Sequence, residues 1–80
     1  MKVYNAVAIR IEELCAERKI TVNGLSHLSG VHPSTIKSII YGASKNPGIA
    51  TIKMLCDGLD ITIVEFFNCE IFKNLEQEIE

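Results

Sequence analysis

Three features of the sequence predict an all-α fold. The chain has 80 residues, 48% of them hydrophobic and 6% aromatic, which suits one small packed domain better than a disordered chain. Apolar residues recur at helical spacing along most of the sequence, and no alternating stretch is long enough to predict a sheet. We expect a five-helix domain over residues 1–68 and a short acidic C-terminal extension over residues 69–80, either helical or frayed.

The first two predicted helices precede residue 30. The first covers about residues 3–18 and has one apolar stripe, at Val7, Ile11 and Leu14. The second opens at Thr21, because a threonine hydroxyl can accept a bond from the free N–H groups at a helix start. It is expected to carry Leu25 and Leu28 inward and to end before Gly30, a residue type common just after a helix.

The third predicted helix covers about residues 33–41 and has two different faces. Pro33 suits a first helical position, where its missing N–H would be unpaired anyway, and Gly42 follows the helix. At about 100° per residue, one arc gathers isoleucines that we assign to the core: Ile36, Ile39 and Ile40. The opposite arc is polar: Ser34, Lys37, Ser38 and Tyr41.

A loop rich in turn residues, 42–48, leads to the last predicted helices. The fourth covers about residues 49–58 and is expected to bury Ile52, Leu55 and Cys56. The fifth opens at Thr62, which has capping-box spacing to Glu65, and carries Ile63, Phe66 and Phe67. In the extension, apolar residues again fall at helical spacing: Ile71, Leu75 and Ile79.

Charge is segregated along the chain, although the formal net charge is only −2. Residues 18–56 contain five basic residues and no acidic one: Arg18, Lys19, Lys37, Lys45 and Lys53. The acidic residues lie before and after this segment. A local basic excess indicates a nucleic-acid partner, whereas scattered solvated side chains are the simpler interpretation.

Several other classes of function lack a sequence pattern. Cys15, Cys56 and Cys69 fit no zinc spacing and suit a reducing cytoplasm, where we expect the protein. His27 and His32 have no further ligand at metal-binding spacing, so we expect no metal and no other cofactor. There is no activated nucleophile, phosphate-binding loop or apolar membrane-length stretch. We therefore expect no enzyme, no small-molecule ligand and no membrane segment.

The second and third predicted helices, joined at a glycine, together describe a helix-turn-helix. Because no bulky side chain obstructs its outer arc, the third helix can enter the major groove of B-DNA, which is about 12 Å wide. An ordinary amphipathic surface helix with serines outside explains the same periodicity. Both interpretations stay open on periodicity and charge alone.

Residues 21–67 resemble the Cro/C1-type (XRE-like) helix-turn-helix DNA-binding domain family. They read TVNGLSHLSGVHPSTIKSIIYGASKNPGIATIKMLCDGLDITIVEFF, and the agreement extends over about residues 7–67. It includes the turn at Gly30, the recognition-helix start at Ser34 and the L-x-I-T-x-x-E-F-F ending. The resemblance implies the five-helix lambda-repressor-like fold, a double-stranded DNA partner and a role as transcriptional regulator, with repression as the expected outcome.

The resemblance also implies which residues contact DNA. The base-facing set lies on the third helix: Pro33, Ser34, Thr35, Lys37 and Ser38. The phosphate-contacting set lies at the start of the second helix and in the loop after the third: Thr21, Asn23, Tyr41, Ser44, Lys45 and Asn46. Helix N-termini and small polar loops offer donors to phosphates, which agrees with this set. His32, at or next to the N-cap of the third helix, joins it if protonated.

Two departures from the family pattern concern DNA contacts. Val22 stands where the family often has a glutamine that braces a phosphate contact, and proline and serine stand at groove positions often held by glutamine, arginine or asparagine. Serine pairs with several base edges, so Lys37 is the strong candidate for a guanine contact, while Pro33 and Thr35 can touch a thymine methyl. We expect modest sequence discrimination, or partial reliance on DNA shape.

A third departure concerns an ion pair between the first helix and the recognition helix. Many family members pair an arginine with a glutamate there, and the corresponding positions hold Cys15 and Ile40. Because both positions are apolar, no charge is left stranded. We predict that Cys15 packs against Ile40.

Two alternatives stay open. The apolar residues of the extension, with Phe72, either pack back on the domain or form a two-fold homodimer contact. Such a dimer would space two recognition helices by about 34 Å on a pseudo-palindromic site. The alternative function is a protein-interaction module of the same fold, such as an antitoxin-like partner, with weak or no DNA binding.

Overall fold

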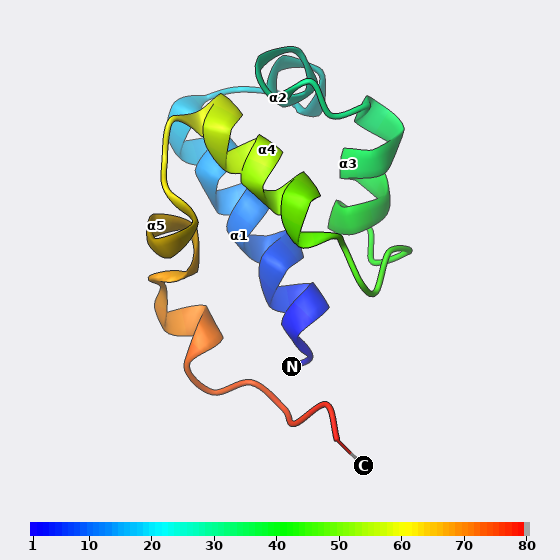
Figure 1. Cartoon of the computed structure of the whole chain (residues 1–80), viewed down its shortest axis with the longest axis vertical. Helices are drawn as coiled ribbons and strands as arrows, with labels where there is room; N and C mark the ends of the chain where they lie inside the picture. The colour runs from blue at the N-terminus through cyan, green and yellow to red at the C-terminus, as the bar shows by residue number, and fades with distance from the viewer. Residues whose placement is uncertain (80) are drawn as a thin grey trace.

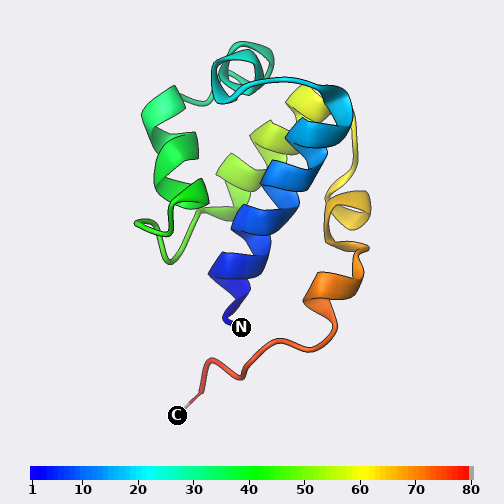
Figure 2. The same cartoon turned by 180° about the vertical axis from the view of Figure 1, so that it is seen from behind.

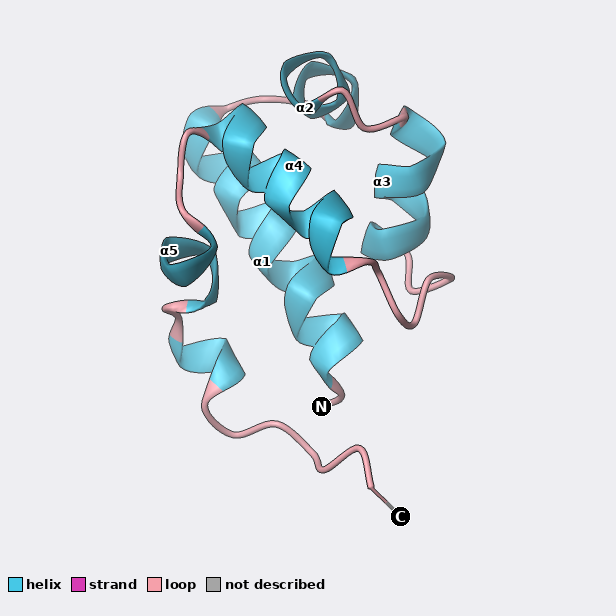
Figure 3. Cartoon of the chain, viewed as in Figure 1, coloured by secondary structure: helices cyan, strands magenta, loops and turns pink. Residues whose placement is uncertain are grey.

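A computed structural model describes residues 1–79, which form helices and no strand (Figures 1 and 3). The elements are α1 (Val3–Arg18), α2 (Val22–Ser29), α3 (Pro33–Ile40), α4 (Ile49–Leu59), α5 (Ile63–Phe67) and a 3₁₀ turn, η1 (Glu70–Phe72). The predicted all-α class with five helices is confirmed, and α4 ends one residue later than predicted. In both views α3 and α5 lie on opposite sides of the molecule (Figures 1 and 2).

One hydrophobic core joins all five helices. Its largest fully buried side chains are Phe66, Ile11, Leu25, Ile36, Ile39, Leu55 and Cys56, so every helix contributes at least one. Among the described residues no polar or charged side chain is buried. The core is therefore stabilised by apolar burial, at roughly 25 cal/mol per Å² removed from water.

The buried face of α2 differs from the prediction. Leu25 is fully buried, but Leu28 is 55% exposed, so the expectation that Leu28 points inward is wrong. α4 approaches α2 at Ser29, since a Cβ built on Gly58 would lie 2.9 Å from the Ser29 main chain. At helical spacing this contact places the inward arc over Val22, Leu25 and Ser29, and Leu28 falls outside it.

Cap chemistry sets the ends of α2 and α3. Thr21 Oγ1 accepts a hydrogen bond from Gly24 N at 3.0 Å, which confirms the predicted cap. Gly30 ends α2 with a φ of 76°, a conformation that glycine adopts without steric penalty. α3 ends at Ile40, one residue before the predicted end, and Gly42 then turns the chain with a φ of 79°.

Side-chain bonds hold the short helix α5. Thr62 Oγ1 accepts from Glu65 N at 3.0 Å, and Glu65 Oε1 accepts from Thr62 N at 3.1 Å, which confirms the predicted capping box. Arg10 of α1 donates from Nε to Phe66 O at 2.7 Å and from Nη2 to Glu65 O at 2.9 Å. Arg10 thus satisfies two carbonyls near the end of α5 and fastens this helix to α1.

The C-terminal extension forms a single helical turn, η1, and is not helical from residue 73 to residue 79. The stripe expected from Ile71, Leu75 and Ile79 is therefore absent, and Ile79 is 82% exposed. Phe72 packs against the core, with its ring centre 4.9 Å from that of Phe67. These contacts place η1 on its own domain.

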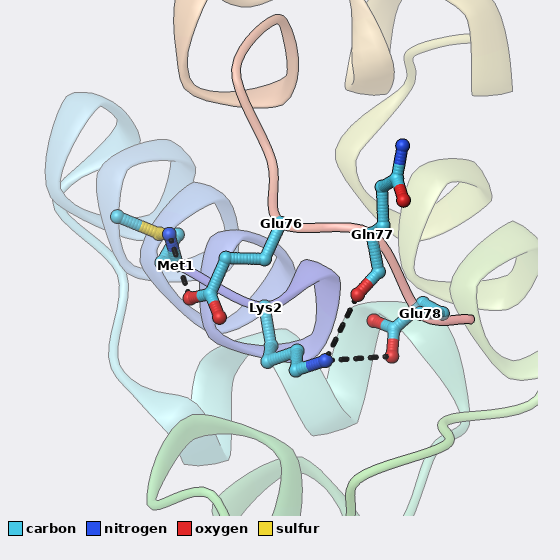
Figure 4. A network of polar contacts seen from close by, with 5 residues as sticks. All are labelled: Met1, Lys2, Glu76, Gln77 and Glu78. Carbon is cyan, nitrogen blue, oxygen red and sulfur yellow. Dashed lines mark hydrogen bonds and ion pairs between the residues drawn. The ribbon is translucent and has the colours of Figure 1, made fainter. Parts of the chain in front are cut away.

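Residues 76–78 run beside the start of the chain (Figure 4). Glu76 N donates to Met1 O at 2.9 Å, and Glu76 Oε2 lies 3.2 Å from the Met1 main-chain nitrogen. Lys2 Nζ donates to Gln77 O at 3.0 Å and lies 3.6 Å from Glu78 Oε2. Main-chain groups that bond across the domain are not available for an internal helix, which explains the extended course of this segment.

Burial separates the three thiols. Cys15 and Cys56 are buried, as predicted, and Cys69 is half-buried. Burial raises the pKa of the Cys15 and Cys56 thiols above the ordinary value, because desolvation disfavours the thiolate.

Since the thiolate is the nucleophile, we expect iodoacetamide at about pH 8 to modify Cys69 first in the folded protein. Mass mapping of a time course measures the order, and early modification of Cys15 or Cys56 would contradict it.

Candidate nucleic-acid interface

The outer face of α3 is polar and open to solvent. Of the five residues predicted to face bases, Ser34, Thr35 and Lys37 are exposed and Pro33 and Ser38 are half-buried. The buried Ile36 and Ile39 on the inner side hold the helix in this rotation. Figure 2 shows α3 along one edge of the molecule, with no helix outside it.

His32 is the N-cap residue of α3, as predicted, and Pro33 occupies the first helical position. His32 Nδ1 accepts a hydrogen bond from Ser34 N at 3.1 Å and also lies 2.7 Å from Ser34 Oγ. Both side chains are exposed. The contact between the His32 ring and the Ser34 hydroxyl was not predicted. The sequence shows only a histidine at the N-cap, two residues before a serine. This spacing does not specify the rotamer of either side chain.

The start of α2 presents the first pair of predicted phosphate donors. Thr21 and Asn23 are both exposed. Thr21 Oγ1 accepts from Gly24 N, so its hydroxyl hydrogen can still be donated outward. The first N–H groups of a helix have no intrahelical partner and favour an anion. The geometry therefore suits a phosphate at this end of α2.

The loop after α3 presents the remaining predicted phosphate donors. Ser44 N donates to Ser38 O at 2.9 Å, which folds the loop back against α3. Lys45 Nζ lies 6.0 Å from the ring centre of Tyr4, within cation–π range. Tyr41 is 76% exposed, Lys45 and Asn46 are also exposed, and Ser44 is half-buried. The structure thus places these polar groups beside the C-terminal end of α3.

The basic side chains of the central segment are all solvent-exposed: Arg18, Lys19, Lys37, Lys45 and Lys53. Lys53 forms an ion pair with Asp57, four residues further along α4. The other four make no ion pair with any residue of the described range 1–79. Their charge is therefore not neutralised by a neighbouring carboxylate and can act on a polyanion.

The two positions of the lost ion pair are apolar and belong to one core. Cys15 is 9% exposed, and the half-buried Ile40 packs against the same hydrophobic cluster. Ile40 also lines a surface groove with Met1 and four residues of α1: Asn5, Ala8, Ile9 and Glu12. Direct contact between Cys15 and Ile40 stays a prediction.

Two other features are absent from residues 1–79. No three His, Cys, Asp or Glu side chains lie close enough together to hold a metal ion. His27 is exposed in the last turn of α2. No helix in this range has the length and hydrophobicity needed to cross a membrane.

The arrangement of α2, the glycine turn and α3 defines a helix-turn-helix DNA-binding domain. A family model described as "Cro/C1-type HTH DNA-binding domain" matches residues 10–70, and the chain belongs to this family. The chain is also similar to the crystal structure of the prophage Lp1 protein 11. The TM-score is 0.80 and the identity 30%, over 94% of this chain and 100% of that chain. No curated protein matches the chain.

Proposed function

We propose that this chain is a sequence-specific transcriptional regulator that binds double-stranded DNA in the cytoplasm and acts as a repressor. α3 is the recognition helix and enters the major groove. The observation that carries this proposal is the open polar face of α3, held outward by the buried Ile36 and Ile39. A helix anchored in this way can reach base edges in a groove about 12 Å wide. The proposed function is binding without catalysis.

The proposed base contacts come from the outer face of α3: Pro33, Ser34, Thr35, Lys37 and Ser38. Lys37 is exposed and is the one basic residue among them, so it is the proposed partner of guanine O6 and N7. Pro33 and Thr35 offer apolar contact to a thymine methyl. With two serines and one lysine as polar readers, the base contacts supply modest discrimination, and DNA shape supplies part of the rest.

The proposed phosphate contacts flank α3: Thr21, Asn23, His32, Tyr41, Ser44, Lys45 and Asn46. Most of these donors are neutral hydroxyl, amide or ring N–H groups, which position the protein without reading sequence. Lys45 adds a charge that attracts the DNA backbone. Contacts at the start of α2 and beyond the end of α3 would hold the helix-turn-helix on the DNA backbone at two separate places.

A homodimer is the second part of the proposal. Two recognition helices about 34 Å apart would read two half-sites one helical turn apart. Bonds to Met1 and Lys2 favour packing of the extension on its own domain, while the exposed Ile79 leaves apolar surface for a second copy. Footprinting on a selected site measures the half-site spacing, and a protected region of one half-site would contradict the dimer.

The alternative function, a protein-interaction module such as an antitoxin-like partner, is favoured by one observation. Leu28 on α2 and Met54 on α4 are 55% and 42% exposed. Met54 Cε also lies 3.9 Å from a Cβ built on Gly30, so this apolar surface reaches the turn of the helix-turn-helix. A protein partner would cover such a surface.

Binding to duplex DNA as a function of salt concentration tests the proposal. Lys45→Ala should weaken binding uniformly across sequences and reduce the slope of log K against log salt by about 1. Lys37→Ala should weaken binding and also relax base preference at one position. Fluorescence anisotropy with duplexes of different sequence measures both effects.

Lys73→Ala is the matched control for these lysine variants. Lys73 is exposed and bonds to Glu70 Oε1 at 2.8 Å. It directly follows η1, and η1 lies on the side of the molecule away from α3 (Figure 1). Its replacement should leave both the affinity and the salt slope unchanged. If the unmodified protein binds no duplex at low salt, as monomer or dimer, the protein-interaction alternative takes the place of this proposal.

A further inference from the structure

At the start of the recognition helix, the main-chain N–H and the side-chain hydroxyl of Ser34 both contact one nitrogen of the His32 ring. Nδ1 of His32 lies 3.1 Å from Ser34 N and 2.7 Å from Ser34 Oγ. A main-chain N–H can only donate, so Nδ1 is an acceptor and carries no proton. With Nδ1 as the acceptor, the Ser34 hydroxyl donates its hydrogen to the same single lone pair as the main-chain N–H, in one three-centre bond, and the ring proton is on Nε2.

This arrangement changes what Ser34 can offer to a partner. A free serine hydroxyl both donates and accepts, which is why serine discriminates poorly among base edges. With its hydrogen held by His32, the Ser34 oxygen presents only lone pairs. Ser34 is exposed, and within residues 1–79 no other group bonds to its Oγ. It is therefore an acceptor facing solvent.

In the major groove, an acceptor has few partners. The hydrogen-bond donors on the base edges are the N6 amine of adenine and the N4 amine of cytosine. Guanine O6 and N7, adenine N7 and thymine O4 are all acceptors and would face the Ser34 oxygen with like partial charge. A serine held in this state favours an amine-bearing base.

We propose that His32 is a positioning residue for base recognition, which makes Ser34 an acceptor that reads the amine of adenine or cytosine. This inference rests on the proposed function, because it requires α3 in the major groove. His32 also keeps Nε2–H as a donor on an exposed ring, so it can contact a phosphate while neutral. The contact with phosphate and the contact with Ser34 use different ring nitrogens and can exist together.

A selection from a library of random duplexes, followed by affinities for single-base variants of the best site, tests the inference. The protein should prefer adenine or cytosine at one position by about fivefold, the size of one neutral hydrogen bond. Ser34→Ala should lose this preference. His32→Gly should admit guanine and thymine there, since glycine is tolerated at an N-cap but leaves the Ser34 hydroxyl free to donate. In the double variant, the glycine should add nothing to the change in base preference made by Ser34→Ala, although it also removes the proposed phosphate contact of the His32 ring.

The outcomes separate this inference from the proposed function. The inference is overturned, while DNA binding stands, if His32→Gly keeps the preference for an amine-bearing base. It is also overturned if His32→Gly broadens base preference by the same amount when Ser34 has already been replaced by alanine. If the unmodified protein binds no duplex, the proposed function fails first. A measurement without variants is the ¹⁵N chemical shifts of the neutral His32 ring. They should report a proton on Nε2, and a proton on Nδ1 would overturn the inference.

Discussion

Replacing Phe66 with alanine is expected to lower the free energy of unfolding by about 3–5 kcal/mol, the range for a buried aromatic side chain. Phe66 is fully buried, and its ring centre lies 4.9 Å from that of Phe67 and 6.2 Å from that of Phe72. Its removal leaves a cavity where α5 meets η1. Because a small domain has about 5–15 kcal/mol of stability in total, the loss is a large fraction. Urea unfolding followed by circular dichroism measures it.

Val64→Ala is the matched control, because Val64 lies on the same helix and is 76% exposed. It should change stability by less than about 0.5 kcal/mol. Phe66→Leu should give a smaller loss than Phe66→Ala and keeps the test informative if the alanine variant does not fold. α5 and α3 lie on opposite sides of the molecule, so folded Phe66→Leu should bind DNA like the unmodified protein (Figure 1). A loss for Phe66→Ala below about 1 kcal/mol would contradict a central role of this side chain.

Helix starts could be predicted where a side chain supplies the cap. The hydroxyls of Thr21 and Thr62 bond to main-chain N–H groups three residues later, and such bonds depend on local sequence alone. Two helix ends offered no such signal. α1 and α4 are followed by Lys19 and Asp60 in the left-handed conformation, with φ of 55° and 56°, where a glycine would be expected. The end of the apolar pattern still located them to within one residue.

Contacts between residues far apart in the chain explain the incorrect prediction for Leu28 and decide the alternative left open for the extension. Leu28 has the spacing of an inward residue, but the position of α4 against Ser29 decides which arc of α2 is buried. The extension has helical apolar spacing, but Glu76 bonds to Met1, at the other end of the described chain. No local pattern reports either contact.

More of the candidate site than of the extension could be predicted from the sequence, because the central part of the site is one short helix. Burial of Ile36 and Ile39 sets which residues of α3 face outward, and both could be assigned from spacing alone. The contact between His32 and Ser34 depends instead on two rotamers and on which ring nitrogen carries the proton. Sequence spacing specifies neither of these.

Gly58→Ala tests the packing that places α2, and the expected result is a loss of stability of up to about 2 kcal/mol. Helix propensity alone predicts the opposite, since alanine is favoured over glycine inside a helix by about 1 kcal/mol. A Cβ on Gly58, however, would lie 2.9 Å from the main-chain nitrogen and Cα of Ser29. Main-chain atoms cannot rotate away, so α2 would have to shift as a unit. Overpacking of this kind costs about 1–3 kcal/mol, which exceeds the gain from propensity over most of that range.

Gly24→Ala is the control that isolates this contact, because it also replaces a glycine inside a helix. A Cβ on Gly24 would have its nearest neighbours at 3.5 Å, in ordinary van der Waals contact. Its stability should therefore be unchanged or higher by up to about 1 kcal/mol, as propensity predicts. Opposite signs for the two variants in urea unfolding would show that the approach of α4 to Ser29 decides the outcome at Gly58. If Gly58→Ala is as stable as Gly24→Ala, α2 moves away from α4 without loss, and another contact holds the helix-turn-helix in place.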